Sequence, residues 1–479
     1  MYKFNYLKKN YFLSSIKILS LFGVLLLMVA CNSTVENNIT YFGGKIKNPR
    51  GKYVYLLKGD KTLDSTILNS NNKFIFQIDS IQLGLYTFKH GPEFQYLYLE
   101  PKDSLLLYLD TWGFDESLVF SGKGSAKNNF LINLFVEQEK NEKIFYDYYN
   151  LDENEFSEKI DSTIDVYTNQ YNDLILSEEK KPSPFFDNLA NIAYKYPLYL
   201  KKERYQFYHK NSNGLYDYPK VNPDFFQFRK SIDLNDESLL GFWPYSMYLE
   251  GYLKNIAYHK ELIDSTENNF ALNYMKAVNE KIDNKKIKNM YLSNGFWASL
   301  SQDYCSKDER KKIDNYYFNN CSDEKLKSES KLALEQLYLL NKGDQMPDIV
   351  LTDTHGSKVK LLNIVENKNS VIYFWPNENG YSEMILEKLP KLKEKYPNVN
   401  FVGIDRNKTN KQWESFLVKN KLQKNNQYKI NEKSEHYLMF KGGWARTLVI
   451  DSNGGIINPF LFFNKGYEIE KHLKKTNKY

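Results

Sequence analysis

Three cysteines and six histidines are the side chains of this 479-residue chain best suited to nucleophilic, redox or metal chemistry. The cysteines are Cys31, Cys305 and Cys321, and the histidines are His90, His209, His259, His355, His436 and His472. No two of them have the spacing of a zinc motif, and no glycine-rich phosphate loop or Gly-x-Ser-x-Gly sequence is present. We therefore predict no metal site and no cofactor. Three cysteines are too few for a disulfide scaffold, so each thiol needs its own explanation.

Cys31 ends an apolar segment near the N-terminus. Residues 1–17 are polar and lysine-rich, and the apolar run Ile18–Ala30 follows them. Because that run is too short to span a bilayer as a stable helix, the pattern is typical of a secretory signal. The alternative is an N-terminal membrane anchor that contains a cysteine by chance. No later apolar run reaches ~18 residues, and we expect everything after Cys31 to fold in an oxidising compartment outside the cytoplasm.

The sequence Leu27-Met28-Val29-Ala30-Cys31 resembles the lipobox of bacterial lipoproteins, except that Met28 stands where leucine is usual. The resemblance implies a signal peptide over residues 1–31 and lipid attachment at Cys31. Several acyl chains on one residue would anchor the protein stably in a membrane. Asn32, where aspartate would imply inner-membrane retention, implies sorting to the outer membrane. We predict a lipid-anchored protein of the cell envelope, at the outer membrane and facing the periplasm or the cell surface.

The net charge of the chain without its predicted signal bears on which partners it can bind. The chain has 65 basic and 59 acidic residues, but four of the lysines lie in the predicted signal. The remaining 61 basic residues nearly balance the acids, so binding to nucleic acid has no electrostatic support. The membrane, through the lipid anchor, and an unidentified protein are the partners that we expect.

The elements that position these residues form three parts, and we predict an α+β multidomain chain. Residues 38–125 alternate apolar and polar side chains between turn signals, which predicts a small antiparallel β-sandwich. The expected strands are Tyr53–Leu57, Phe74–Ile78, Leu85–Phe88, Tyr96–Leu99, Leu105–Leu109 and Leu118–Phe120. Gly44, Leu63-Asp64-Ser65, the strands around Pro101 and the run from Phe120 to Ser125 resemble the β-rich domain that precedes thioredoxin-like modules in bacterial lipoproteins. That domain has no assigned chemistry, so the resemblance implies architecture alone.

Residues 126–341 follow a helical period and predict an α-helical domain of seven to nine helices. Tyrosines crowd the stretch Ile192–Tyr218, as Tyr194, Tyr196, Tyr199, Tyr205 and Tyr208. One interpretation is a stacking surface for a glycan or a nucleotide. The other is a pair of amphipathic helices with tyrosine at the rim of the core, and we favour it because stacking proteins also need a basic groove.

Residues 342–479 change to a strand–helix–strand order followed by a hairpin and a last helix. We expect buried strands at 370–375 and 400–405, with a helix between them that carries Ile385, Leu389 and Leu392 on one face. A hairpin joins 447–451 to 456–457 through Ser452-Asn453-Gly454-Gly455. The final helix is expected over 468–475. This order predicts a thioredoxin-type α/β domain.

The same residues resemble the TlpA-like thiol–disulfide oxidoreductases of the thioredoxin and peroxiredoxin superfamily. The matching features are Pro347, the Leu351–Leu361 hairpin with Gly356, the strand end Phe374-Trp375, and Leu448–Asp451 followed by Gly454. The resemblance implies a thioredoxin fold and a Cys-x-x-Cys motif at the start of a helix. A helix N-terminus lowers the pKa of such a thiol and makes it nucleophilic.

The chain departs from that family at both elements of its active site. The positions that correspond to the two cysteines are Asn379 and Ser382, and Ala445 stands where the family has a cis-proline. Neither an amide nor an isolated hydroxyl can exchange disulfides at neutral pH. We expect Asn379 or Ser382 to serve as a helix N-cap instead. The resemblance therefore leads to a redox-inactive thioredoxin-like domain, without catalytic residues.

The altered site has two further interpretations. It can be a docking surface for a partner, because aromatic and arginine side chains dominate binding hot spots. The residues of that surface are Trp375, Asn379, Tyr381, Trp444 and Arg446. Alternatively, Trp375 and Trp444 fill the core beside a shortened loop.

The leading prediction is a membrane-tethered lipoprotein whose thioredoxin domain binds a partner or is a structural module. The alternative is a thiol–disulfide oxidoreductase or peroxidase-like enzyme of the envelope, which would need Cys305 or Cys321, because no cysteine follows Cys321. We predict that these two remain unbonded. A helix expected from Ser306 to about Asn319 would hold them ~24 Å apart, and a disulfide spans only ~4.4–6.8 Å between Cα atoms.

Overall fold

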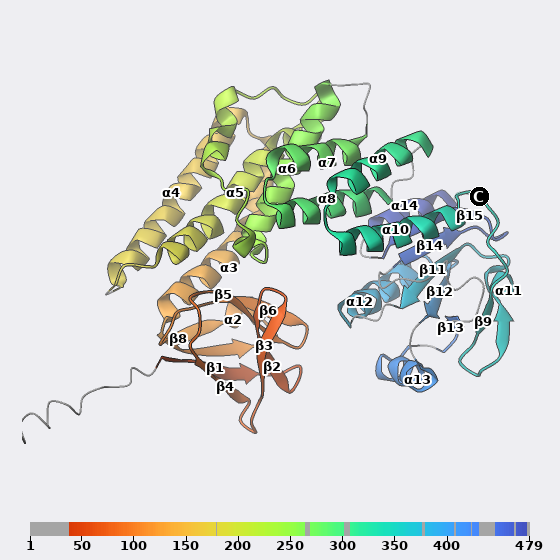
Figure 1. The fold of residues 1–479 in the computed structure, drawn as a ribbon, viewed down its shortest axis with the longest axis horizontal. Coiled ribbons are helices and arrows are strands. Elements are labelled where there is room, and N and C mark those ends of the chain that lie inside the picture. The colour runs from red at the N-terminus through yellow and green to blue at the C-terminus, as the bar shows by residue number, and fades with distance from the viewer. Residues whose placement is uncertain are drawn as a thin grey trace, which may run out of the picture. The chain divides into compact units, whose positions relative to one another are not determined.

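The computed structural model describes residues 38–178, 180–263, 269–300, 307–375, 379–406, 409–422, 424–430, 446–463 and 466–476. The chain divides into two compact units (Figure 1). The first takes the chain up to Lys143 together with Asp165–Ala190, and the second takes Ile144–Ile164 and Asn191–Tyr479. Within the described part of the chain, no helix has the length and apolarity that a bilayer-crossing segment needs.

The N-terminal part is a β-sandwich of two four-stranded sheets, as predicted. One sheet has the order β4 (Lys73–Asp79), β1 (Ile39–Lys47), β7 (Ser104–Asp110) and β8 (Val119–Lys123). The other has the order β3 (Lys61–Ile67), β2 (Tyr53–Lys58), β5 (Gly84–His90) and β6 (Glu93–Leu99), and a short helix α2 (Phe114–Ser117) precedes β8. Phe42 lies between the sheets, with its ring centroid 5.5–5.9 Å from the rings of Phe74, Phe76 and Phe88. These rings pack at different angles and form part of the core between the two sheets.

Three details of the sandwich differ from the sequence prediction, and the first is strand β1, which was not among the expected strands. The sheets are not wholly antiparallel, because β1 and β7 pair in parallel with Tyr41 opposite Ser104. Parallel neighbours need a long connection, and here five strands lie between them in the chain. Strand β3 was not expected, since its sequence is mostly polar and its side chains are almost all exposed. It forms an outer strand of its sheet, where one neighbour suffices.

Helix α3 (Ser125–Asp147) closes one side of the sandwich with two adjacent asparagines. The Asn128 side chain accepts a hydrogen bond from the Tyr98 backbone N–H and donates one to its carbonyl, both at 2.8 Å. Asn129 makes the same pair of bonds with Phe120, at 2.8 and 2.9 Å. Tyr98 lies in β6 and Phe120 in β8, which are the outer strands of the two sheets. The two amides therefore satisfy backbone groups that no strand pairs.

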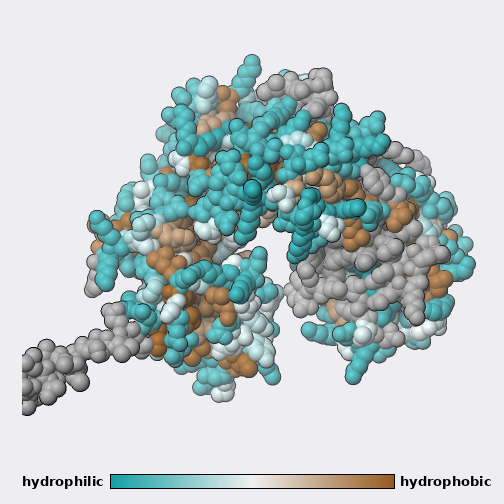
Figure 2. Space-filling view, viewed as in Figure 1, coloured by the Kyte–Doolittle hydropathy of each residue, from teal (hydrophilic) through white to brown (hydrophobic). Residues whose placement is uncertain are grey.

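The central region is helical, and its described part contains eight α-helices, within the predicted range. They are α3, α4 (Glu153–Ser177), α5 (Pro184–Ser212), α6 (Trp243–Ile263), α7 (Phe270–Lys281), α8 (Lys285–Leu300), α9 (Lys307–Asn320) and α10 (Glu324–Leu339). Short 3₁₀ turns lie at η1 (Tyr148–Asn150), η2 (Pro223–Ser231) and η3 (Glu237–Leu239). The face of this region turned to the viewer in Figure 2 is mostly hydrophilic, which matches its lysine- and glutamate-rich sequence. Tyr194, Tyr196 and Tyr205 lie on one continuous helix, α5, so the predicted pair of helices was wrong. The three side chains are buried, and they lie within the core and not at its rim.

The C-terminal part is a thioredoxin-like α/β domain, as predicted. Its seven-stranded sheet has the order β10 (Lys358–Lys360), β9 (Val350–Thr352), β13 (Gln427–Ile430), β12 (Asn400–Asp405), β11 (Ser370–Trp375), β14 (Arg446–Ile450) and β15 (Ile456–Phe462). Strand β11 pairs in parallel with β12 and antiparallel with β14, and β14 pairs antiparallel with β15. The helices are α11 (Leu361–Val365), α12 (Asn379–Lys395), α13 (Asn410–Lys419) and α14 (Gly466–Thr476). The sequence predicted neither α11, α13 nor β13.

Both faces of this sheet are covered, which explains the unbroken apolar sequence of its central strand. Alternate residues of β11 face opposite sides, so Tyr373 and Trp375 share a core with Leu389 of α12 and Leu473 of α14. Phe374 faces a second core, on the other side of the sheet. The carboxyl end of β11 therefore leads towards α12 with its aromatic side chains already fixed.

Candidate functional site

The first candidate site is the N-terminal end of α12, which follows the central strand of the thioredoxin-like domain. The strand ends at Trp375 and the helix begins at Asn379. Asn379 is the first residue of this helix, and Ser382 follows three residues later. Ser382 is only 6% exposed. The expectation that Ser382 caps the helix was wrong, because a cap precedes the first helical residue and Ser382 lies inside the helix. The side chains of Asn379 and Tyr381 lie outside the described residues.

Trp375 does not belong to a docking surface, and that prediction was wrong. Its side chain is fully buried. Its ring makes edge contacts with Tyr373 and Phe416, at centroid distances of 5.4 and 5.0 Å. The physical reason is position, because an outward-pointing residue of a central strand still faces the helices that cover the sheet. The alternative, that Trp375 fills the core, is confirmed.

One glutamine joins the polar atoms of these aromatic side chains. Trp375 Nε1 donates to Gln427 Oε1 at 2.8 Å, and Gln427 Nε2 donates to the Tyr373 hydroxyl at 2.9 Å. Burial raises the pKa of Tyr373 well above its usual value, although the hydrogen bond from Gln427 opposes that shift. The bridge passes over Gly403, where an added Cβ would lie 2.4 Å from Gln427 Oε1 and 2.8 Å from the Tyr373 hydroxyl. A glycine in β12 is therefore required for this arrangement.

Several predicted residues lie outside the described part of the chain. They are Cys31, Cys305, Trp444, Ala445 and the side chain of Arg446. Helix α9 ends at Asn320, so the helix expected between Cys305 and Cys321 is present. Cys321 follows it and is 3% exposed. Cys321 forms no disulfide with any described residue. That Cys305 and Cys321 remain unbonded stays a prediction.

Two charged residues near this site were missed from the sequence. Asp405 pairs with Trp375 across β12 and β11, and Arg406 follows it. Both are almost fully buried, at 0% and 2% exposure, and the Arg406 guanidinium lies 5.2 Å from the centre of the Phe374 ring. The sequence does indicate these two residues, because charged residues at the carboxyl end of an apolar parallel strand lie at the sheet edge where α/β proteins bind their ligands.

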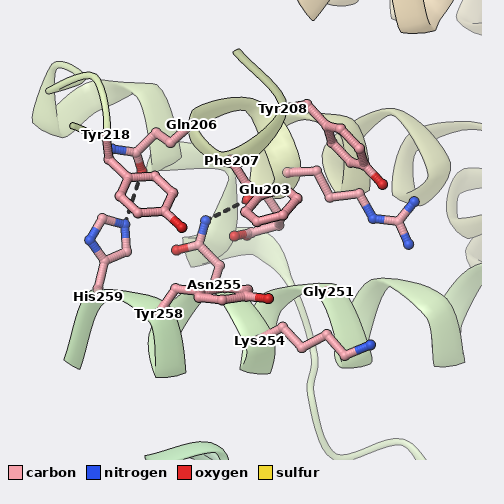
Figure 3. Close-up of a pocket in the computed structure, with 11 residues that line it drawn as sticks. Glu203, Gln206, Phe207, Tyr208, Tyr218, Gly251, Lys254, Asn255, Tyr258 and His259 are labelled. Atoms are coloured by element: carbon pink, nitrogen blue, oxygen red, sulfur yellow. Dashed lines mark hydrogen bonds between the residues drawn. The ribbon is translucent and has the colours of Figure 1, made fainter. Parts of the chain in front are cut away.

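The second candidate site is a cavity of about 210 Å³ in the helical region, between α5 and α6. Figure 3 shows Tyr208, Phe207 and Tyr218 on one side and Tyr258, Asn255 and His259 on the other. The lining residues are Glu203, Arg204, Gln206, Phe207, Tyr208, Tyr218, Gly251, Lys254, Asn255, Tyr258 and His259. At Gly251 an added Cβ would lie 2.1 Å from Leu200 Cδ1, so glycine allows the two helices to approach here.

A buried ion pair forms the inner wall of this cavity. Arg229 donates from Nε to Glu203 Oε1 at 2.8 Å and from Nη2 to Oε2 at 2.5 Å. The Tyr248 hydroxyl donates to the same carboxylate at 3.2 Å. Burial raises the pKa of Glu203, and the guanidinium of Arg229 opposes that shift. Two-point pairing of this kind fixes both side chains and compensates for their desolvation.

Two residues of this cavity were considered from the sequence: Tyr208, which was placed at the rim of the core, and His259, which was assigned to no site. Tyr208 contacts Tyr149 at a centroid distance of 4.8 Å, and it also lines the cavity. The lining comes from two helices whose residues are about fifty positions apart, so no local pattern reports it. Among the described residues, no group of three His, Cys, Asp or Glu side chains could hold a metal ion.

The strand order and the covering helices define the C-terminal part as an α/β domain of the thioredoxin type. Comparison with protein families agrees, since the profile of the AhpC/TSA family matches residues 342–460. This segment of the chain is thus similar to that family. No curated protein matches the chain.

Three solved structures with a likeness to the chain each cover less than a third of it. A domain of a possible thiol-disulfide isomerase from Cytophaga hutchinsonii is 18% identical, covers 29% of this chain and 97% of its own, and has a TM-score of 0.26. A thiol:disulfide interchange protein from Bacteroides sp. is 17% identical, covers 29% and 91%, and has a TM-score of 0.26. The thioredoxin domain of a thiol-disulfide oxidoreductase from Bacteroides vulgatus is 18% identical, covers 28% and 97%, and has a TM-score of 0.25.

Proposed function

We propose that this protein is a lipid-anchored lipoprotein of the bacterial cell envelope whose thioredoxin-like domain is redox-inactive. In this proposal the domain binds a partner or is a structural module. The observation that carries it is the pair of residues at the start of α12. The positions at which the similar enzymes carry two cysteines hold Asn379 and Ser382, and no cysteine occurs after Cys321.

The environment of Ser382 supports the absence of a replacement chemistry. A serine nucleophile needs a base within hydrogen-bond reach and access to its substrate. Ser382 is 6% exposed within the helix, and the neighbouring Trp375 is fully buried. Access to this hydroxyl is therefore poor.

The first experiment measures insulin reduction in the presence of dithiothreitol. We expect the full mature chain to match the control without protein, because disulfide exchange needs one thiolate to attack and a second to resolve the mixed disulfide. Turnover well above that control, lost in a Cys305→Ser/Cys321→Ser variant, would refute redox inactivity. Loss of that turnover in the double serine variant would establish that the helical region supplies the thiols.

A matched gain-of-function series tests the same assignment of positions. Asn379→Cys with Ser382→Cys places two thiols three residues apart on a helix, where Cβ atoms are ~5–6 Å apart. We expect a disulfide that dithiothreitol reduces, with weak turnover, because one thiol is introduced at a buried position. Adding Ala445→Pro should raise that turnover. A double variant that forms no disulfide would contradict the assigned positions.

The lipid anchor needs a separate test, because it rests on the sequence around Cys31. Metabolic labelling with a fatty-acid analogue should tag the wild type and fail for Cys31→Ala. Membrane fractionation should find the wild type with the outer membrane. Labelling that persists in Cys31→Ala would end the lipoprotein proposal without affecting the redox one.

An oxidoreductase remains the second candidate, because the AhpC/TSA profile matches residues 342–460, which include the seven-stranded sheet except for the last two residues of β15. It would require Cys321, or Cys305, to act in place of the missing motif. Cys321 is 3% exposed at the end of α9, which makes it a poor nucleophile unless that region opens. The insulin assay with the double serine variant separates the two candidates.

A further inference from the structure

We infer that the cavity between α5 and α6 binds a small sugar acid, a molecule that carries hydroxyl groups beside one carboxylate. This goes beyond the proposed function, because the cavity lies in the helical region and not in the thioredoxin-like domain. Its volume of about 210 Å³ is below the ~300–1,000 Å³ of sites for drug-sized ligands. A monosaccharide derivative is therefore an appropriate size.

Unmet acceptors in the cavity require a ligand that donates hydrogen bonds. Asn255 is 7% exposed, and its Nδ2 donates to the Glu203 carbonyl at 2.5 Å. Its Oδ1 is buried and accepts no hydrogen bond within the described part of the chain. Figure 3 shows this oxygen on the side of Asn255 nearer to Tyr218. A buried acceptor without a donor is costly, so a hydroxyl group placed here by a ligand would be favourable.

His259 supplies a second acceptor at the same end of the cavity. Gln206 Nε2 donates to the Pro219 carbonyl at 2.7 Å, so Gln206 Oε1 faces His259 Nε2, at 2.9 Å. His259 therefore donates from Nε2, and its Nδ1 keeps a lone pair. Burial lowers the pKa of His259, which keeps the ring neutral and Nδ1 an acceptor. Adjacent hydroxyl groups on one ligand could serve both side chains.

The charges that line the cavity select an anion. Arg204 and Lys254 are the cationic side chains of the lining, and Glu203 is its carboxylate. Lys254 is already paired with Glu250 on α6 at 2.5 Å, so Arg204 is the cation that recognises an anion here. Arg229 neutralises Glu203 through two hydrogen bonds, so the carboxylate does not repel an anion. A guanidinium recognises a carboxylate well because its fork matches the two oxygens. An ammonium group on the ligand would be repelled, which disfavours amino acids.

The aromatic side chains favour a ring with apolar C–H faces. Phe207 and Tyr258 stack on each other at a centroid distance of 5.6 Å, and both line the cavity. Tyr208 and Tyr218 add two further rings. Aromatic rings offer flat apolar area, and tyrosine adds a hydroxyl that can bond to a polar ligand. A sugar ring presents that combination of apolar and hydroxylated faces.

The experiment is isothermal titration calorimetry of the mature chain with three probes. D-glucuronate carries both features, D-glucose lacks the carboxylate, and glutarate lacks the hydroxyl groups. We expect glucuronate to bind with a dissociation constant of about 1 mM or tighter, and at least about tenfold more tightly than the other two. Absence of glucuronate binding, or equal binding of glucose, overturns the inference. Equal binding of glutarate overturns it as well.

Variants of the lining residues locate the binding. Arg204→Gln should weaken glucuronate binding about tenfold, and Asn255→Leu should abolish it. Lys254→Gln should have a smaller effect, because Lys254 is paired with Glu250. The matched controls are Lys195→Gln on α5 and Lys260→Gln on α6, neither of which lines the cavity. Asn255→Leu is interpreted only if its thermal unfolding matches the wild type. Glucuronate binding that persists unchanged in Arg204→Gln places the ligand elsewhere and refutes the inference.

Discussion

Replacing Gln427 by leucine should lower the stability of the central strands of the thioredoxin-like domain by an amount that can be worked out from its hydrogen bonds. The change removes the acceptor of Trp375 Nε1 and the donor to the Tyr373 hydroxyl, both of which are fully buried. Each buried polar group left without a partner costs ~1–3 kcal/mol, so the expected total is about 2–6 kcal/mol. Adding Tyr373→Phe to Gln427→Leu removes the Tyr373 hydroxyl, which is one of the two polar groups left without a partner. It should therefore restore about 1–3 kcal/mol.

The measurement is hydrogen exchange of the backbone amides in β11 and β12, read by mass spectrometry in the full chain. Local exchange suits a chain of several parts, for which a single free energy of unfolding is not well defined. Gln427→Leu should accelerate exchange of these amides by about 30-fold or more, as ~1.4 kcal/mol corresponds to tenfold. Gln82→Leu is the matched control, since this glutamine of the sandwich is exposed and its side-chain oxygen accepts a hydrogen bond from Lys58. Unchanged exchange in Gln427→Leu, or added damage from Tyr373→Phe, would refute the reasoning.

Three further predictions concern other parts of the chain. Gly403→Ala should accelerate hydrogen exchange of the β11 and β12 amides, because the added Cβ would lie 2.4 Å from Gln427 Oε1 and would destabilise the domain by about 1–3 kcal/mol. Unaltered exchange in this variant would contradict the close packing. Burial raises the pKa of Asp103 to about 6, so the folded sandwich holds a proton between pH ~4 and ~6 that the unfolded chain releases. The thermal stability of the sandwich should thus decrease as pH rises through that window, and it should decrease less in Asp103→Asn. Calorimetry of both proteins near pH ~4.5 and ~7 measures this decrease. Peptide mapping without reductant should recover no Cys305–Cys321 crosslink, because the 14 residues of α9 extend ~20 Å; a crosslinked peptide would contradict this.

The fold was largely predictable because its strands are strongly patterned. Strand β11 is apolar from Val371 to Trp375, and the hairpin from β14 to β15 turns at Asn453-Gly454, so β11, β14 and the turn were located within a residue. Strand β15 continues to Phe462, five residues beyond its expected end. Strand β3 was missed because an outer strand with exposed side chains needs no apolar pattern. The parallel pairing of β1 with β7 was missed because it depends on contacts between residues some sixty positions apart.

The candidate sites were less predictable, for two physical reasons. Side-chain direction misled the assignment of Trp375, whose ring type suggests binding but whose strand is covered on both faces. Helix register misled the assignment of Ser382, since a shift of a few residues moves a serine from a cap to a buried turn. The cavity between α5 and α6 exists only because Gly251 permits close helix crossing, and a lone glycine within a helix gives no such indication.

The two asparagines at the start of α3 bear on how this protein avoids self-association. The outer strands of a sheet expose unpaired N–H and C=O groups, which can recruit strands from other molecules and seed aggregates. Asn128 and Asn129 occupy those groups at Tyr98 and Phe120 with a helix that cannot extend the sheet. A truncated chain that ends before Ser125 would expose both edges at once. Such a fragment would be prone to intermolecular β-pairing. Helix α3 therefore protects strands β6 and β8 from pairing with other molecules.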